Sequence, residues 1–328
     1  MRKVTSRDVA REAGVSQNTV LLVARKSPRV RAATRLVVEA AMERLHYQPN
    51  AMASALRSQR TRTLAFVVAA GGLHNHVTTE LLSGAIEGAA RHDYTIVPVL
   101  VRPDDAGTGV VALFRRQNVS GALVLALTTD DPMVAALAAV GCPTVSLLQP
   151  SSAIAPERSV MADDYAGAVA AVRHLLDRGH RRLGLIAVHG SGNAMAAERV
   201  AGAHAVAESA GIPLAEGWAD EWSVEAGRAA AAELLAQHPR PTGIFAISDR
   251  LAFGVLAVAA EAGLAVPGDL AVVGFDNAEW AQHSSPPLTT VEFPLREMAV
   301  AGVERLLSGD AAPDWRSASA RLVLRGSS

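Results

Sequence analysis

The chain has 328 residues, half of them apolar and 19% of them charged, a length that exceeds one ordinary hydrophobic core and predicts two or three domains. The single cysteine, Cys142, excludes an internal disulfide and a cysteine-rich zinc site, and no apolar run is long enough to cross a bilayer. The N-terminus carries no signal-peptide pattern, so we expect a cytoplasmic protein.

The charge is unevenly distributed, although the net charge is only −1. Residues 1–62 contain thirteen Lys and Arg but four Asp and Glu, whereas the remaining residues contain eighteen basic and twenty-eight acidic side chains. A basic head on an acidic body is typical of a phosphate-binding module attached to another domain. The alternative is a solvated helical face on which the charges cluster by chance.

Two short helices joined by a tight turn are predicted at residues 4–24. The first runs over residues 6–13, and the second over residues 17–24. Gly14 allows the positive φ of the turn between them. The expected helix caps are Thr5 with Asp8, which resemble a capping box, and Ser16.

One face of the second helix has the character of a nucleic-acid reader. Helical spacing places Gln17, Asn18, Leu21, Leu22 and Arg25 on this face. Two amides at the N-terminal end of an exposed helix suit hydrogen bonding to base edges in a major groove. The alternative is a helical hairpin that merely has polar residues outside.

A third helix and a short connecting segment complete the N-terminal part. The helix is predicted over residues 32–45 and ends before Pro49. Its apolar residues recur at helical spacing: Leu36, Val37, Ala40, Ala41 and Leu45. Residues 50–57 favour another helix, which is too short to be stable alone in water. This segment is either a functional hinge or a linker that happens to favour helix.

The rest of the chain alternates apolar strands with helices, which predicts parallel βαβ units. The expected strands begin near residues 64, 94, 121, 142, 183, 243 and 270, and the expected helices span 79–92, 110–117, 133–140, 165–178, 196–210, 226–237 and 251–262. The pattern restarts after Ser159, so we expect two α/β lobes with a ligand cleft between them. The last part contains a strand-like segment at 288–293, a helix at 295–307 and a strand-like segment at 320–325.

The motifs together resemble LacI/GalR-type bacterial transcription regulators over essentially the whole chain. They follow the family's order: VTSRDVAREAGVSQNTV, NAMASALR after HYQP, HLLDRGHRRLGLI, GIFAISDRLAFG, VPGDLAVVGFDN and PPLTTVEFPLREMAVAGVERLL. The resemblance implies an α/β protein with an N-terminal helix-turn-helix domain (1–48), a hinge helix and linker (49–62), and a periplasmic-binding-protein-like core. The core lobes are expected at 63–161, completed by about 291–321, and at 162–290.

The resemblance also implies DNA-binding roles. Gln17 and Asn18 would be the main base readers, and Leu56 matches the hinge leucine that family members insert into the minor groove, where an apolar wedge kinks the duplex. The other expected DNA-binding residues are Thr5, Ser16, Thr19, Leu21, Leu22, Arg25, Asn50 and Ala53. Leu21, Leu22 and Arg25 depart from the residues usual in the family, so contact with thymine methyl groups and a lost phosphate contact are both open.

Six residues are expected to bind the effector. The resemblance matches Arg199 to a ligand-contacting arginine, Asp249 and Asp276 to acidic positions at strand ends, and Trp222 to an aromatic platform. Asn75 and His76 match a loop that faces the cleft. Asp249 could instead cap a helix, Asp276 could be a turn residue, and Trp222 could serve only in packing. A metal site at His74 and His76 is a weak alternative.

We therefore predict a ligand-responsive transcriptional regulator, a repressor rather than an activator, that binds a palindromic operator as a homodimer. Its small-molecule effector is expected to be a sugar or a related metabolite. The alternative is a solute-binding protein without regulatory DNA binding. We expect no enzyme activity, because neither glycine-bearing loop forms a dinucleotide or P-loop motif and no Ser-His-Asp arrangement has supporting motifs. We also expect no cofactor, no metal and no membrane partner.

Overall fold

The computed structural model describes residues 4–24, 27, 29–47, 61–69, 75–102, 107–116, 118–190, 192–308 and 318–328. The chain divides into two compact units, Met1–Thr61 and Arg62–Ser328, called here the head and the core. Four predicted DNA-binding residues, Arg25, Asn50, Ala53 and Leu56, lie outside the described residues, as does His74. Within the described ranges, no helix is long and apolar enough to cross a membrane.

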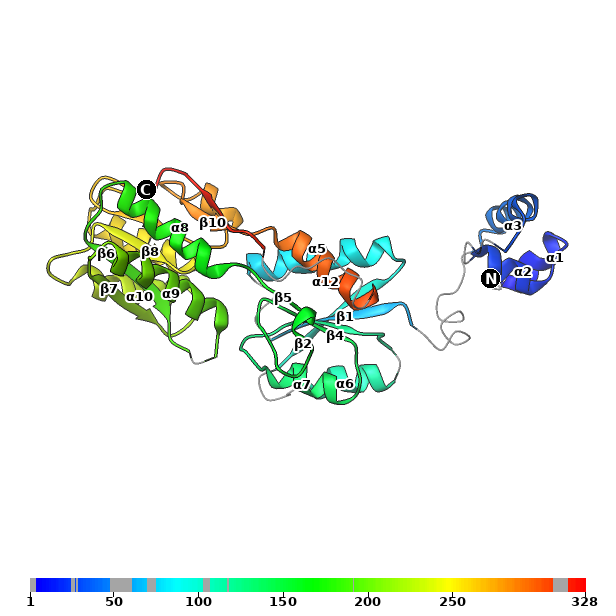
Figure 1. The fold of residues 1–328 in the computed structure, drawn as a ribbon. Coiled ribbons are helices and arrows are strands. Elements are labelled where there is room, and N and C mark those ends of the chain that lie inside the picture. The colour runs from blue at the N-terminus through cyan, green and yellow to red at the C-terminus, as the bar shows by residue number, and fades with distance from the viewer. Residues whose placement is uncertain are drawn as a thin grey trace. The chain divides into compact units, whose positions relative to one another are not determined.

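Among the described residues, the head contains three helices, drawn in blue in Figure 1: α1 (Ser6–Glu12), α2 (Gln17–Ala24) and α3 (Ala32–Arg44). Gly14 joins α1 to α2 with a φ of 65°, a conformation that glycine adopts without steric cost. The three helices enclose a small apolar core: Val9, Ala10, Val20, Val23, Val38 and Ala41. The predicted helix-turn-helix therefore forms around six small side chains.

The third helix buries only part of the face that its periodicity predicted: Ala41 and Leu45 contribute to the core of the head, whereas other predicted residues do not. Leu36 is 68% exposed and Val37 is 50% exposed, whereas Val38 and Ala41 are fully buried. The buried stripe of α3 packs against α1 and α2, and the apolar residues beside this stripe remain in solvent.

The first lobe of the core is built on a five-stranded parallel sheet with strand order β2-β1-β3-β4-β5. The strands are β1 (Thr63–Ala69), β2 (Thr95–Val101), β3 (Ala122–Leu125), β4 (Thr144–Leu147) and β5 (Ser159–Val160). The helices are α5 (His76–Arg91), α6 (Thr108–Arg115), α7 (Pro132–Ala139) and α12 (Leu295–Ser308). Figure 1 shows α5 and α12 on one face of the sheet and α6 and α7 on the other.

Alternation along β1 explains these two layers. Leu64, Phe66 and Val68 pack with α5 and α12, whereas Ala65 and Val67 pack with α6 and α7. Successive side chains of a strand point to opposite faces, so an uninterrupted apolar strand serves two cores at once.

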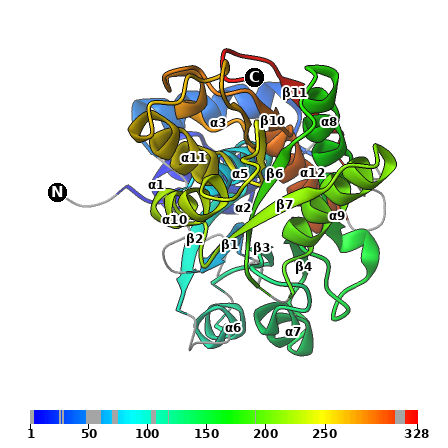
Figure 2. The ribbon, with the colours of Figure 1, turned by 90° about the vertical axis from the view of Figure 1, so that its left-hand side faces the viewer.

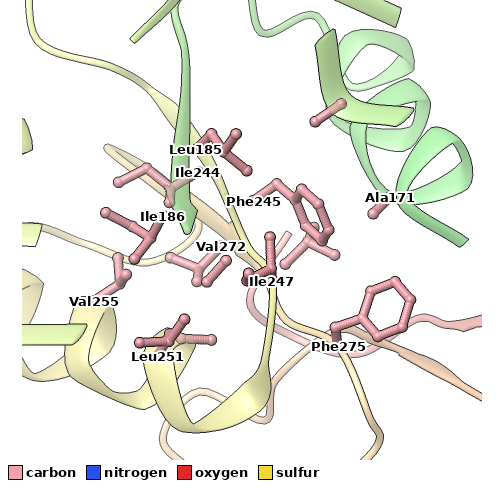
Figure 3. Close-up of a cluster of buried hydrophobic side chains, with 14 of the residues drawn as sticks. Ala171, Leu185, Ile186, Ile244, Phe245, Ile247, Leu251, Val255, Val272 and Phe275 are labelled. Carbon is pink, nitrogen blue, oxygen red and sulfur yellow. The ribbon is translucent and has the colours of Figure 1, made fainter. Parts of the chain in front are cut away.

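The second lobe repeats this plan with a four-stranded parallel sheet, order β7-β6-β8-β9. Two of its strands, β6 and β7, are labelled in Figure 2. Its strands are β6 (Leu183–Val188), β7 (Leu214–Ala219), β8 (Gly243–Ala246) and β9 (Ala271–Val273). Its helices are α8 (Asp164–Asp177), α9 (Ala194–Ser209), α10 (Val224–Leu235) and α11 (Asp249–Glu261). Helices α8 and α9 pack as one pair, and α10 and α11 as another. In Figure 3, Ile244 of β8 lies toward Val255 of α11, while Phe245 lies toward Ala171 of α8.

The chain crosses between the lobes more than once. Ala162 forms an isolated parallel bridge with Ala318, and the Asp163 amide donates to the Ala318 carbonyl at 3.0 Å. After the second lobe, α12 returns to the first lobe, while β10 (Thr290–Glu292) and β11 (Arg321–Val323) form an antiparallel ladder beside α8. The core also contains the 3-10 turns η2 (Pro156–Arg158) and η3 (Glu279–Gln282).

Two strands were missing from the prediction. β5 has only two residues, and β7 has the sequence LAEGWA, in which small and charged residues hide the apolar alternation. Both are edge strands of their sheets, where only one neighbour provides pairing and burial.

Candidate functional site

The predicted contacts at the helix ends of the head are first of all helix caps. The Thr5 hydroxyl donates to Asp8 Oδ2 at 2.6 Å, and the Thr5 and Asp8 side chains together form the capping box of α1. Ser16 Oγ accepts from the Thr19 amide at 3.1 Å, and the Ser16 and Thr19 hydroxyls lie 2.9 Å apart. These bonds hold the N-terminus of α2, which has the dipole and the free amides that favour a phosphate.

The two amide side chains at the start of α2 differ in their surroundings. Asn18 is exposed and makes no side-chain hydrogen bond with the described residues of the head. Gln17 is half-buried, and its Nε2 donates to Ser6 Oγ at 2.8 Å. Leu21 and Leu22 are half-buried on the same helix. Sequence reasoning missed Ser6, because a serine at the first helical position has no distinctive signal.

Arg199 of α9 is the centre of a buried ionic cluster in the second lobe. Its Nε donates to Asp164 Oδ1 at 2.7 Å, and its Nη1 donates to Asp276 Oδ1 at 3.1 Å and to the Ile247 carbonyl at 2.6 Å. The guanidinium carbon also lies 3.8 Å from the centre of the Phe275 ring, a distance suited to a cation–π contact. The structure thus brings together two predicted effector residues, Arg199 and Asp276.

Asp164 is the part of this cluster that the sequence did not reveal. Asp163 and Asp164 are adjacent, so their side chains point in different directions. Asp163 caps α8 by accepting from the Ala166 amide, whereas Asp164 is 2% exposed and faces Arg199. The usable signal was the position of Asp164 at the start of a helix that packs against α9.

Asp249 is buried at the start of α11, where its carboxyl group joins this helix to two later segments by hydrogen bonds. Its Oδ2 accepts from the Ala278 amide at 2.6 Å, and its Oδ1 accepts from the Thr290 hydroxyl at 2.5 Å. The cap of α11 is Ser248, which accepts from the Leu251 amide at 3.3 Å, so the alternative role of Asp249 as the cap is wrong. Asp249 becomes the first helical residue instead.

Three carboxyl groups of this region have raised pKa values, and burial is the largest cause in each: Asp164, Asp249 and Asp276. Burial, followed by the nearby charge of Asp276, raises the pKa of Asp249 to about 8. Burial also raises the pKa of Asp276 to about 6, although the Arg199 charge acts in the opposite direction. Asp276 has a φ of 105°, so it is also a turn residue, as the alternative interpretation held.

The remaining predicted effector residues lie outside this cluster. Asn75 caps α5 by accepting from the Thr78 amide at 2.7 Å. His76 is half-buried, and its pKa is lowered by burial. Trp222 is half-buried against the core of the second lobe, which agrees with its packing alternative. No hydrogen bond or ion pair among the described residues joins Asn75 or His76 to Arg199.

A hydrogen-bonded joint between the lobes was also missed. Gln149, which follows β4 and is fully buried, donates from Nε2 to Asn193 Oδ1 at 3.1 Å and accepts from the Ala194 amide at 3.0 Å. Asn193 caps α9 and donates from Nδ2 to the Leu127 carbonyl at 3.3 Å. The joint therefore ties the first lobe to the start of the helix that carries Arg199.

The head and the core together define a class of protein. A basic helix-turn-helix and a two-lobed α/β core with a polar cluster near strand ends are the parts of a ligand-responsive DNA-binding regulator. Comparison with known proteins agrees: residues 5–50 match the family model for bacterial regulatory proteins of the lacI family, and residues 172–328 match a periplasmic binding protein-like domain.

Two relatives match nearly the whole chain. The HTH-type transcriptional regulator DegA of Bacillus subtilis is 31% identical, covering 98% of this chain and 95% of that protein. The HTH-type transcriptional repressor PurR of Photobacterium profundum is 30% identical, covering 92% and 91%. The chain belongs to the LacI family and is a DNA-binding transcriptional regulator.

Solved structures support the same conclusion. A lac repressor dimer bound to operator and the anti-inducer ONPF superposes with a TM-score of 0.83 at 29% identity, with 99% of each chain covered. A complex of the transcriptional regulator CelR with cellobiose gives a TM-score of 0.73 at 29% identity, covering 99% of this chain and all of that one. These relatives are regulators, which agrees with the predicted class.

Proposed function

We propose that this protein is a repressor that binds a palindromic operator as a homodimer and responds to a small, neutral, hydroxyl-rich effector. The observation that carries the proposal is the Arg199 cluster on the same chain as a basic helix-turn-helix head. The head supplies DNA binding, and the cluster supplies a polar site whose occupancy can be transmitted to the head.

The charge balance of the cluster supports a neutral effector. The single guanidinium of Arg199 is shared between the carboxylates of Asp164 and Asp276. Because both carboxylates already neutralise this cation, a phosphate or carboxylate ligand would meet net negative charge. Hydroxyl groups of a sugar can instead accept from the guanidinium and donate to a carboxylate oxygen. We therefore favour a sugar or a related uncharged metabolite.

The joint at Gln149 offers a route for the response. An effector that contacts Arg199 on α9 acts on the same helix whose first turn is bonded to Gln149 of the first lobe. We propose that effector binding shifts the population of lobe orientations through this joint. The change in the core then alters the geometry in which the two heads of a dimer reach the operator.

A second copy of the chain is proposed to dimerise on the first lobe. The edge strand β2 exposes Val97 (39%) and Leu100 (52%), and α5, which lies against β2, exposes Ile86 (51%). An apolar edge strand is a pairing hazard unless a partner covers it. In the second lobe Trp280 is 71% exposed on η3, an aromatic side chain of the kind enriched at interfaces.

The proposal is tested by selecting genomic fragments with the purified full-length protein and sequencing them. A shared palindrome is expected, and adding candidate sugars to the recovered site in a gel shift should change its affinity. Binding should weaken steeply with salt because phosphate contacts release counterions. Absence of any shared site at modest salt, with and without the sugar panel, would contradict the proposal.

A substitution at Leu56 tests the proposed role of the hinge in DNA binding. Leu56→Ala is expected to weaken binding to the selected palindrome far more than binding to random duplex, because an apolar wedge contributes only where the DNA is kinked. Equal losses on both duplexes would contradict a wedge role for Leu56.

A further inference from the structure

A side-chain hydrogen bond ties the start of α2 to the start of α1. Gln17 Nε2 and Ser6 Oγ lie 2.8 Å apart and join residues eleven positions apart in the sequence. Gln17 is the first residue of α2, and Ser6 is the first residue of α1. Both helices also share the apolar core of the head, so the hydrogen bond spans two elements that are already packed together.

Ser6 is well placed to act as a fixed anchor. It is only 8% exposed, and the preceding residue, Thr5, forms the capping box of α1 with Asp8. A serine side chain has a single rotatable bond to its hydroxyl oxygen, so a buried serine on a capped helix offers a hydrogen-bonding group at a defined point. The long Gln17 side chain is thereby held at its far end.

The neighbouring amide provides a contrast on the same helix. Asn18 is exposed and makes no side-chain hydrogen bond with the part of the head that the structure describes. Of the two amides proposed to read bases, Gln17 is therefore held by a hydrogen bond within the described part of the head, and Asn18 is not. The Gln17 amide still has Oε1 and a second N–H for an external partner.

We propose that Ser6 is a positioning residue that sharpens the base specificity of Gln17. This inference rests on the proposed function, because it requires α2 to read operator bases. A glutamine amide whose Oε1 and N–H are both available matches the N6 and N7 edge of adenine. Ordering the side chain in advance lowers the entropic cost of correct pairing and prevents the amide from rotating to suit another base.

The test is a double-mutant cycle in the full-length protein with the variants Ser6→Ala, Gln17→Ala and both together. The probes are the palindrome selected by the wild-type protein, the same palindrome with each base pair replaced in turn, and a random duplex. Ser6→Ala is expected to weaken binding to the palindrome roughly two- to tenfold and to flatten the preference at the base pair that Gln17→Ala also flattens. Binding to random duplex should not change.

Two comparisons separate positioning from other roles. In the Gln17→Ala background, Ser6→Ala should have no further effect, whereas an equal further loss would mean that Ser6 contacts DNA itself. Ser6→Thr keeps the hydroxyl and should restore the base preference. Unchanged discrimination by Ser6→Ala, with the protein folded, would overturn the inference.

A measurement on the wild-type protein does not depend on any variant folding. Side-chain amide relaxation by NMR should show the Gln17 amide more ordered than the Asn18 amide in the absence of DNA. Equal disorder of the two amides would overturn the inference. The two failures are distinguishable: a wild-type protein that selects no shared site defeats the proposed function, whereas selection of a site with no effect of Ser6→Ala defeats only this inference.

Discussion

At the scale of single residues, the second lobe contains a buried carboxyl group with a raised pKa, that of Asp249. Asp249 is 1% exposed, and burial raises its pKa to about 8, well above the usual value of 3.8. A folded-state pKa above the unfolded one means that the native state binds an extra proton. The stabilising contribution of this proton to the free energy of unfolding is fully present at low pH and is lost as the pH rises from about 4 toward 8.

The variant Asp249→Asn tests this linkage. Its amide can still accept from the Ala278 amide and can donate to the Thr290 hydroxyl. We expect the free energy of unfolding of the wild type to fall, relative to the variant, by on the order of 1 kcal/mol per pH unit between pH 5 and 8. Urea unfolding of both proteins at several pH values measures the difference, and parallel pH profiles would contradict the raised pKa.

At the scale of elements, the helices α5 and α12 pack with a close approach of their backbones. Gly84 of α5 faces α12, and a Cβ atom there would overlap the backbone carbonyl of Arg296. A larger side chain at such a contact is destabilising, because the backbone cannot move aside as easily as a flexible side chain can. The packing of α5 on α12 thus depends on the absence of a Cβ atom at Gly84.

Gly84→Ala is expected to destabilise the core by about 1–3 kcal/mol, because the added methyl group overpacks the α5–α12 contact. Ser83→Ala, one residue away at a half-buried position whose hydroxyl donates only within α5 to the Thr79 carbonyl, is the matched control and should change stability little. Denaturant unfolding monitored by circular dichroism distinguishes the two. Similar unfolding midpoints for the two variants would show that α5 and α12 can separate without cost.

The joint between β4 and α9 gives a second prediction at this scale. Gln149→Ala removes the acceptor of the Ala194 amide and the donor to Asn193. We expect faster hydrogen exchange at the Ala194 amide and a smaller change in operator affinity on effector addition. Exchange at an amide within β8 serves as the internal control. Unchanged exchange at Ala194 would mean that the joint contributes nothing to the coupling of the lobes.

At the scale of the whole molecule, assembly and DNA binding are linked through symmetry. A palindrome is read by two heads related by a two-fold axis, so loss of the dimer removes half of the contacts. The exposed apolar side chains of β2 and α5 are the surface on which we place this contact. They are not needed for the internal core, since they remain in solvent within one chain.

Leu100→Glu should therefore produce a folded monomer with much weaker operator binding. A charge buried in an apolar interface without a partner is costly, whereas an exposed charge on a monomer is not. Sedimentation equilibrium at micromolar concentration measures the mass, and circular dichroism checks the fold. Leu324→Glu, at another exposed apolar side chain (63%), is the control and should remain dimeric. A dimeric Leu100→Glu protein would place the contact elsewhere.

Local sequence was enough to specify the helix-turn-helix, the two α/β lobes and most element bounds, because periodic burial is a local property. The capping box at Thr5 and Asp8 and the positive φ at Gly14 followed from the immediate neighbours of those residues. Family resemblance placed Arg199 and Asp276 in one site, and the structure brings their side chains to 3.1 Å. These features can be predicted either from short stretches of sequence or from the resemblance to related proteins.

Packing between distant segments was needed to settle which polar groups face one another. Tertiary packing determines these hydrogen-bonded pairs: Asp164 with Arg199, Asp249 with Ala278 and Thr290, Gln149 with Asn193, and Ser6 with Gln17. It also left Leu36 and Val37 in solvent despite their helical spacing. A buried polar group must find its partner wherever the fold places one, and that partner can lie far away in the chain, so local sequence does not encode the pairing.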